Sequence, residues 1–256
     1  SLSRPGSSCY YMIVKFAPSV QNRRKGEGIK TPGTGGTHSV RNTGQTPRKG
    51  NLKGGRNTLR EEIRGVFALK RKRLQQALSR RRKRRIVDGS RLQSAVLVPI
   101  FQKQEQYHVL LTRRTDKVKE HKGEISFPGG ACEEADGTLV NTALRESAEE
   151  IGLAAEAVEV LGRLDDTVSR TSNYIISPFV GLIPWPYRFK MNGDETAEII
   201  EVPLPVLLNG GSLHKEKETI DGEEMTSYSY HYQGKVIWGA TARILHQFLD
   251  IFSSLQ

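Results

Sequence analysis

Short apolar runs separated by polar turns dominate the chain from residue 92 onward. The segments 93–101 and 107–114 are rich in valine, isoleucine and leucine, as buried strands are. The polar stretch QKQEQ between them has the length of a hairpin connection. We therefore predict that these two segments form adjacent antiparallel strands.

The remaining apolar segments predict further strands and two helices. Strands or strand–turn units are expected at 158–165, 177–184 and 199–208, and a hairpin over 229–239 turning at Gln233–Gly234. Helical spacing predicts helices over 138–151 and 240–252, with Trp238, Ile244 and Leu245 in the core. Since strands and helices mix without regular alternation, the predicted class is α+β with a mixed sheet.

The N-terminal third has a different pattern. A capping box of Thr58 with Glu61 predicts that a helix begins at Thr58. Its apolar positions recur at helical spacing: Leu59, Ile63, Val66, Phe67, Leu74 and Leu78. The basic run 79–85 is expected to end this helix.

Residues 18–57 show no apolar period and few apolar side chains. Such a segment buries too little surface to offset its ordering entropy, so we expect a disordered basic tail. The predicted organisation is therefore a tail over 1–57, a basic helical segment over 58–91 and an α+β domain over 92–256.

Charge divides the chain at the same place. Residues 1–91 hold 24 Lys and Arg against 4 Asp and Glu, whereas residues 92–256 hold 15 against 24. The basic run 79–85 is either a solvated helix end or part of a weak contact of residues 1–91 with nucleic acid or another anionic surface. No aromatic residues interleave with it, which argues against a base-stacking site.

Two cysteines, Cys9 and Cys132, offer neither a disulfide framework nor a metal-binding cluster. No apolar run approaches the ~18 residues that span a bilayer. We expect a cytoplasmic protein, with organellar targeting by the acid-poor tail as the alternative. Monomer and homodimer both stay open.

Three glutamates cluster near the end of the helix predicted over 138–151. Glu146, Glu149 and Glu150 have i, i+3 and i+4 spacing, so they share one face. The opposite side is expected to pack on the sheet: Ala143, Leu144, Ser147, Ala148 and Ile151. A solvated acidic face is the simplest interpretation. The alternative is a site for a hard divalent cation such as Mg²⁺ or Mn²⁺.

The surrounding residues favour the metal site. Two glycines, Gly129 and Gly130, precede the helix, Arg145 precedes Glu146, and Gly152 follows at the expected helix end. The arrangement resembles the Nudix box, with Arg145 to Leu153 matching its helical half. The loop is one residue longer than the pattern, and Asp136 fills the early Glu position, with Glu133 or Glu134 as substitutes.

A second match lies just upstream. Residues 110–130 resemble the signature that precedes the Nudix box in coenzyme A pyrophosphatases. The positions on pattern are Leu110, Leu111, Thr112, Arg114, Gly123, Phe127, Pro128, Gly129 and Gly130. Thr115 stands for Ser or Ala, and Lys119 for Arg. The resemblance covers roughly residues 92–252 and implies the Nudix fold, a mixed sheet sandwiched between helices.

The resemblance also implies a reaction, the metal-dependent hydrolysis of the pyrophosphate bond of coenzyme A or a derivative. The products are 4′-phosphopantetheine, or its acyl form, and adenosine 3′,5′-bisphosphate. Glu146, Glu149 and Glu150 would bind Mg²⁺ or Mn²⁺, and Arg145 would hold Glu146. The general base would be Glu195, or else Glu149 or Glu150.

Substrate contacts are expected at the glycine pair and at two basic residues. The backbone at Gly129 and Gly130 would approach the metal or the phosphates. Arg114 and Lys119 would contact the 3′-phosphate or the pyrophosphate, because this substrate carries extra negative charge.

Two rival functions remain. One is a Nudix hydrolase of another nucleoside diphosphate derivative, such as NADH, ADP-ribose or a dNTP. The other is a nucleic-acid-binding protein that acts through its basic N-terminal third.

Overall fold

The computed structural model describes residues 53–117, 122–220 and 223–255. The expected disorder of the tail over 1–57 falls almost wholly outside these residues, and so does Lys119. Within the described ranges, no helix combines the length and the apolar character that crossing a bilayer requires.

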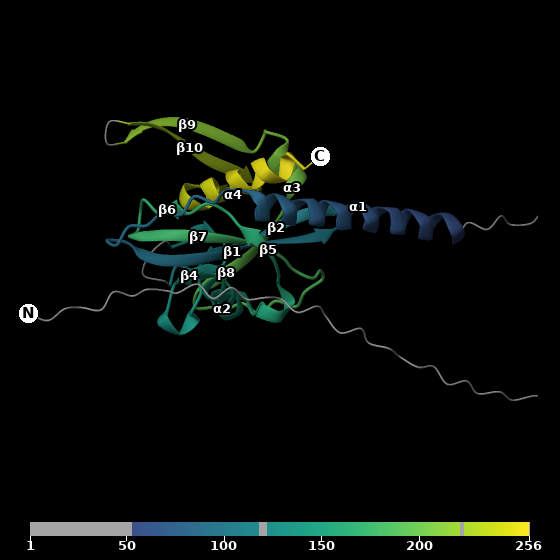
Figure 1. The fold of residues 1–256 in the computed structure, drawn as a ribbon, viewed down its shortest axis with the longest axis horizontal. Coiled ribbons are helices and arrows are strands. Elements are labelled where there is room, and N and C mark those ends of the chain that lie inside the picture. Colours follow the sequence, from purple (N-terminus) through teal and green to yellow (C-terminus); the bar gives the residue numbers. More distant parts are fainter. Residues whose placement is uncertain (1–52, 118–121, 221–222, 256) are drawn as a thin grey trace, which may run out of the picture.

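A mixed sheet forms the centre of the molecule (Figure 1). Its strands are β1 (Leu92–Lys103), β2 (Gln106–Arg114), β3 (Ile125–Ser126), β4 (Gly129–Ala131), β5 (Glu159–Arg163), β6 (Thr167–Val168), β7 (Tyr174–Leu182) and β8 (Thr196–Pro203). The main path is β3-β2-β1-β7-β5, with β4 beside β1, β6 beside β7 and β8 beside β2. β1 and β7 run parallel, and the other pairs are antiparallel.

The predicted hairpin of the first two strands is confirmed. Lys103 pairs with Gln106, and the turn residues Gln104 and Glu105 adopt φ of 49° and 61°. β1 alternates its buried side chains between the two faces of the sheet, with Leu97 and Phe101 on one side and Val98 and Ile100 on the other. A strand buried on both faces has a nearly continuous apolar run, which is why the sequence indicated it.

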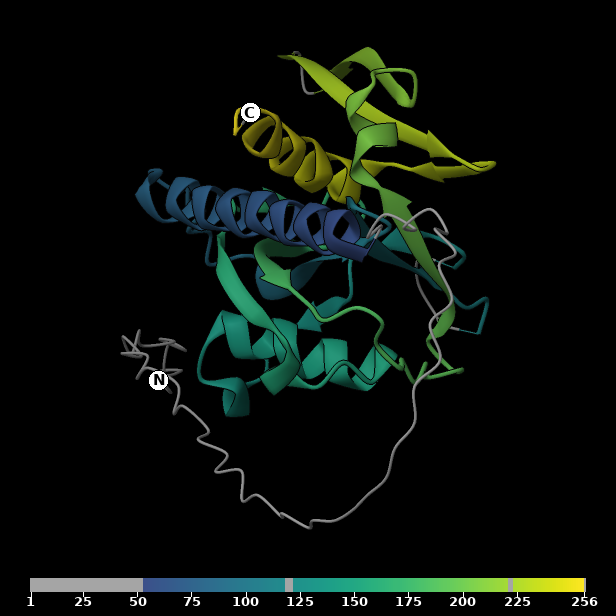
Figure 2. The ribbon, with the colours of Figure 1, turned by 90° about the vertical axis from the view of Figure 1, so that its right-hand side faces the viewer.

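Helices cover both faces of the sheet. α2 (Leu139–Ile151) lies on one face, and α1 (Lys53–Arg80) and α4 (Gly239–Ser253) lie on the other, where Figure 2 shows them side by side. The expected sandwich and the helices predicted over 138–151 and 240–252 are confirmed. Two 3₁₀ turns, η1 (Glu134–Asp136) and η2 (Ala155–Ala157), flank α2.

Two boundaries differ from the prediction. α1 begins at Lys53, so Thr58 lies inside the helix and is not its N-cap, because the residues before it continue the helical backbone. The segment 199–208 is β8 followed by a short helix, α3 (Leu204–Leu208), with a proline in its first turn.

α1 packs on the same core as the sheet. Leu74 and Leu78 are fully buried there, and a Cβ atom at Gly162 of β5 would lie 2.7 Å from the Leu78 Cβ. Arg81 pairs with Asp165 at 2.8 Å. The division of the chain at residue 91 stays a prediction.

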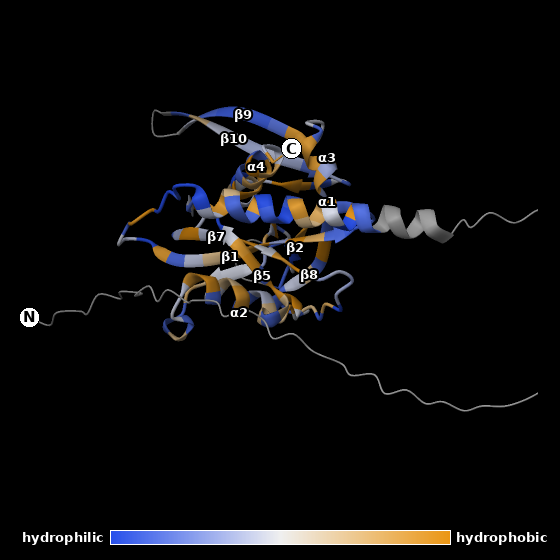
Figure 3. Cartoon of the chain, turned by 45° about the vertical axis from the view of Figure 1, so that its right-hand side comes forward, coloured by the Kyte–Doolittle hydropathy of each residue, from blue (hydrophilic) through white to orange (hydrophobic). Residues whose placement is uncertain are grey.

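A second, three-stranded sheet covers α4. It contains β9 (Leu213–Ile220), β10 (Glu223–Tyr232) and β11 (Lys235–Ile237), and the predicted turn at Gln233–Gly234 is confirmed by its positive φ angles. β9 was not predicted. Figure 3 shows it mainly hydrophilic, since its charged residues conceal the alternation that marks a strand.

Candidate active site

The helix that carries the glutamates is capped at both ends. The Thr138 side chain accepts a hydrogen bond from the Asn141 N–H at 3.3 Å. Gly152 ends α2 in the left-handed conformation (φ 68°), and its N–H donates to the Ala148 carbonyl at 3.0 Å. These caps fix where the acidic residues lie relative to the preceding loop.

A buried carboxylate anchors Arg145. The Arg145 Nε donates to Asp136 Oδ1 at 2.7 Å, and its Nη2 donates to Oδ2 at 3.1 Å. Thr142 Oγ1 and the Glu133 N–H also donate to Asp136. Chiefly through the Arg145 hydrogen bond, the pKa of Asp136 falls to about 2. The early acid of the motif therefore serves to hold the arginine.

Arg145 reaches the glutamates with its other nitrogen. Its Nη1 lies 2.9 Å from Glu146 Oε1 and 3.1 Å from Glu149 Oε2. The structure thus places Arg145 in contact with Glu146, as the sequence suggested, and adds Glu149 as a second partner. Arg145 links the glycine loop, the 3₁₀ turn and the acidic helix face.

The three glutamates differ widely in exposure. The side chain of Glu149 is 56% exposed, that of Glu146 16% and that of Glu150 5%. The expected division of α2 into two faces is therefore wrong in part. Glu150 lies on the packed side with Ser147, because a residue three positions along a helix falls on nearly the same side. Ala148, expected on the packed side, is exposed.

The buried carboxylate of Glu150 has too few partners to offset the loss of its hydration. Arg114 Nη1 is 3.9 Å from Glu150 Oε1, and Glu150 Oε2 is buried with no hydrogen-bond partner among the described residues. Desolvation raises the pKa of Glu150 to about 8, and the charges of Glu146 and Glu195 add to this rise. Burial also raises the pKa of Glu146, and Glu195 contributes again. Glu195 therefore lies within electrostatic reach of both.

The glycine pair is required by close packing. A Cβ atom at Gly130 would lie 2.5 Å from the Glu146 carboxylate. Gly129 has φ of 152°, and a Cβ atom there would overlap the Ala95 carbonyl on β1. The pair lets β4 pair with β1 and lets Glu146 approach the loop. The expected approach of this backbone to a metal or phosphate stays a prediction.

The carboxylates are the type of ligand that a divalent cation prefers, but their side chains do not converge on one point. Among the residues that the structure places, no three Asp, Glu, His or Cys side chains converge as a ready metal site. The buried Oε2 of Glu150 nevertheless lacks a partner among the described residues, and burial, with a smaller contribution from neighbouring carboxylates, raises the pKa values of Glu146 and Glu150, which a cation would lower. Glu146, Glu149 and Glu150 would hold the ion, and Arg145 contacts two of them, Glu146 and Glu149.

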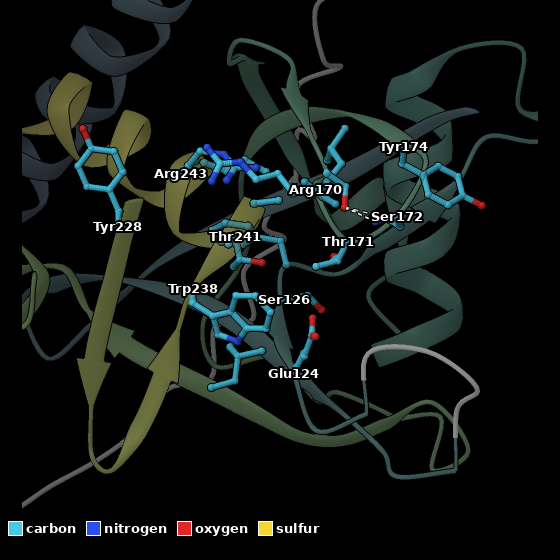
Figure 4. A pocket seen from close by; sticks show the side chains of 18 of the residues that line it. Glu124, Ser126, Arg170, Thr171, Ser172, Tyr174, Tyr228, Trp238, Thr241 and Arg243 are labelled. Atoms are coloured by element: carbon cyan, nitrogen blue, oxygen red, sulfur yellow. Dashed lines mark hydrogen bonds between the residues drawn. The ribbon is translucent and has the colours of Figure 1, made fainter. Parts of the chain in front are cut away.

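A cavity of about 710 Å³ borders this cluster. Arg114, Gly129 and Gly130 form one part of its lining, and another part comes from the segment 169–172, β9, β10 and the start of α4 (Figure 4). Of the sequence-predicted site residues, the structure brings together Arg114, the glycine pair and the acids, with Glu195 beside them. Lys119 lies outside the described residues.

Three residues of this cavity were missed from the sequence. Trp238 was expected in the core but is 45% exposed and faces the cavity, because it lies between β11 and α4 where neither element covers it. Ile244 and Leu245 are buried as predicted. Arg170 and Arg243 also line the cavity. A polar SRTSN segment around Arg170 was the only local signal, and Arg243 had none.

Comparison with known proteins identifies the family. The NUDIX domain model matches residues 91–223. An uncharacterized Nudix hydrolase, NudL, from Photorhabdus laumondii is 38% identical over 64% of this chain and 86% of the relative. NudL of Yersinia pestis is 38% identical over 59% of this chain and 75% of the relative.

A solved NUDIX hydrolase from Alicyclobacillus acidocaldarius aligns with 46% of this chain and 82% of its own, at 20% identity and a TM-score of 0.40. The family model and the NudL relatives establish the family of this chain. The chain belongs to the Nudix family, pyrophosphohydrolases that act on nucleoside diphosphate derivatives and generally use divalent metal ions.

Proposed function

We propose that the chain hydrolyses the pyrophosphate bond of coenzyme A or a derivative. The products would be adenosine 3′,5′-bisphosphate and 4′-phosphopantetheine or its acyl form. One observation carries this proposal: residues of the 110–130 signature line a nucleotide-sized cavity at the point where it meets the acidic cluster.

The acidic residues provide the hydrolytic end of the site. Glu146, Glu149 and Glu150 would hold Mg²⁺ or Mn²⁺, which when bound neutralises phosphoryl oxygens and activates water. Arg145, fixed by Asp136, keeps Glu146 and Glu149 beside the loop. These contacts support the metal assignment because they orient carboxylates that would otherwise repel one another.

Arg114 supports the binding of an anionic bridge. Its guanidinium lies against Glu150, and its Nε is buried with no hydrogen-bond partner among the described residues. A buried donor without a partner is costly unless a ligand supplies the acceptor. A phosphoryl oxygen at this position would satisfy it. Arg114 is therefore assigned to the pyrophosphate.

Glu195 is the preferred general base. Its backbone carbonyl accepts a hydrogen bond from the Thr115 N–H at 2.9 Å, and Thr115 Oγ1 donates to the Asp194 carbonyl at 2.7 Å. These bonds tie the Glu195 loop to the end of β2, beside the acids. Glu149 and Glu150 are the alternatives, but each is already assigned to metal binding.

Product analysis tests the proposal. The full chain is incubated with Mg²⁺ or Mn²⁺ and, separately, with coenzyme A, dephospho-coenzyme A, NADH, ADP-ribose and dNTPs. We expect adenosine 3′,5′-bisphosphate to be released from coenzyme A with the highest kcat/KM of the series. A higher kcat/KM for NADH, ADP-ribose or a dNTP would assign the chain to another Nudix activity.

The nucleic-acid alternative has less support. Part of the basic N-terminal third is engaged within the protein, because Arg71 pairs with Glu159 and Arg81 with Asp165. Nucleic-acid binding should weaken steeply with salt and weaken further when residues 1–52 are removed. Hydrolysis by the metal-loaded enzyme should survive that removal.

A further inference from the structure

The cavity has a second charged region, away from the glutamates. Arg170 lies in the connection between β6 and β7, and Arg243 lies in the second turn of α4. Figure 4 shows both side chains in the cavity lining, in the same part of the view. The two residues are far apart in sequence, and only the packing of α4 beside β6 brings them together.

Few negatively charged groups of the protein balance the charges of these two arginines. Arg170 Nη1 lies 3.3 Å from Glu218 Oε2. Among the described residues, no carboxylate oxygen lies within 4 Å of the Arg243 guanidinium nitrogens. Burial lowers the pKa of Arg243, and the charge of Arg170 lowers it further. Two guanidinium groups that repel each other in a cavity favour an anionic ligand.

Arg243 also has hydrogen-bonding capacity left for a ligand. Its Nη2 donates to the Val168 carbonyl at 2.7 Å, which fixes the guanidinium in place. A guanidinium carries five N–H donors in a planar fork, so most of the fork is still available. A phosphate group can accept two such bonds at once.

Neutral hydroxyl groups line the same region. Thr171 and Ser172 line the cavity beside Arg170, and the Ser172 hydroxyl donates to Ser169 at 2.7 Å. The first turn of α4, with Thr241, also faces the cavity, and no side chain caps this helix end. Its free N–H groups and positive dipole end add to the attraction of the two arginines for an anion.

We infer that Arg170, Arg243 and the first turn of α4 form an anion subsite that binds a substrate phosphate group remote from the pyrophosphate. The inference rests on the proposed function, since coenzyme A carries such a group as its 3′-phosphate. It reassigns the role that the sequence suggested for Arg114, which lies against Glu150 at the reacting end.

Equilibrium binding of two product-like probes tests the subsite without hydrolysis. The Kd values of adenosine 3′,5′-bisphosphate and of 5′-AMP are measured by calorimetry. We expect wild-type protein to prefer the bisphosphate about tenfold, as one charge-assisted phosphate contact would give. Arg170→Ala and Arg243→Ala should abolish this preference. The matched control is Arg188→Ala, which removes an exposed arginine outside the cavity lining.

The substitution Glu218→Gln should increase the affinity for adenosine 3′,5′-bisphosphate. It removes the carboxylate that pairs with Arg170, so the bisphosphate should bind about threefold more tightly while 5′-AMP changes less. Unchanged preference in Arg170→Ala, in Arg243→Ala and in Glu218→Gln would overturn the subsite. Because Arg243 also ties α4 to β6, its variants are compared by thermal unfolding, and Arg243→Lys keeps the charge without the fork.

Kinetics separate this inference from the proposed function. The ratio of kcat/KM for coenzyme A to that for dephospho-coenzyme A should fall about tenfold in Arg170→Ala and stay unchanged in Arg188→Ala. An unchanged ratio in Arg170→Ala would overturn the subsite while leaving coenzyme A hydrolysis intact. Failure of wild-type protein to hydrolyse coenzyme A would refute the proposed function, and bisphosphate binding would still decide the subsite.

Discussion

The acidic cluster lies beside one part of the cavity, the arginine pair lines another, and the two are built in opposite ways. The glutamates sit within five consecutive positions of α2, and Arg145 and Asp136 hold them from the adjacent loop. Arg170 and Arg243 come from two separate elements, joined through the Val168 carbonyl. The first is a local motif, and the second exists only in the folded chain.

Their electrostatics also differ. At the acidic end, burial raises the pKa values of Glu146 and Glu150, and neighbouring carboxylates, Glu195 among them, add to the rise. At the other end, two arginines line the cavity, and Glu218 pairs with one of them, Arg170. A substrate that brings a cation to one end and a phosphate to the other would satisfy both. The difference therefore separates the residues that we propose for hydrolysis from those that we propose for substrate selection.

The largest effect is expected at the acidic end. Glu149→Gln and Glu150→Gln should each lower kcat at least ~10²-fold, because the amide loses the anionic oxygens that a divalent ion requires. The measurement is kcat at saturating Mg²⁺, with circular dichroism to confirm folding. Glu156→Gln, an exposed change just beyond α2, is the control. Near-normal kcat in both variants would remove the hydrolytic role from this cluster.

A smaller effect is expected at Trp238, which lines the cavity. Trp238→Leu should raise KM about tenfold and change kcat less than threefold, because a base stacked on the indole contributes mainly to binding. Trp238→Phe should restore part of the affinity. A fall in kcat with unchanged KM would instead connect Trp238 with the hydrolytic step.

The pH dependence of stability sharpens the contrast in charge. The pKa of Glu150 is about 8 in the folded protein, above its ordinary value of 4.5. Between these values the folded state binds more protons than the unfolded chain, so metal-free protein should lose stability as pH rises. We expect Tm to fall by a few degrees from pH 6 to pH 8, and by less in Glu150→Gln. Equal falls in both proteins would show that Glu150 is ionised throughout.

The smallest effect concerns the residues before α1. Removal of residues 1–52 should leave kcat within about threefold at ~0.15 M salt, because charge outside the core is screened over roughly 8 Å. A cooperative thermal transition should also remain. Loss of activity in the shortened chain would make the N-terminal segment part of the site and break the two-ended description of the cavity.

Local patterns predicted the parts of this protein that depend on neighbours in sequence. The apolar run of β1, the glycine that ends α2 and the turn at Gln233–Gly234 each have a short-range cause, and each was found where expected. The contact of Arg145 with Glu146 also follows from adjacent positions. Such features are visible because their energetic reasons are contained in a few consecutive residues.

The rest depends on contacts that sequence spacing does not reveal. β9 forms although half of its residues are charged, since β10 provides its hydrogen-bonding partners. Glu150 becomes buried because the end of β2, with Arg114, lies against it. The position of Trp238 in a cavity wall is set by where β11 ends and α4 begins. These outcomes require the tertiary structure.

The burial of α1 has a consequence for synthesis of the chain. Leu74 and Leu78 leave the ribosome long before the residues that cover them. The Glu159 partner of Arg71 comes 88 residues later, and the Leu255 carbonyl that accepts from Arg73 comes 182 residues later. At a synthesis rate of roughly 5–20 residues per second, these partners are made roughly 4–36 seconds after the helix. During this interval, the many lysines and arginines of α1 repel other nascent chains. This repulsion opposes association of those chains with the apolar residues of α1 before these are buried.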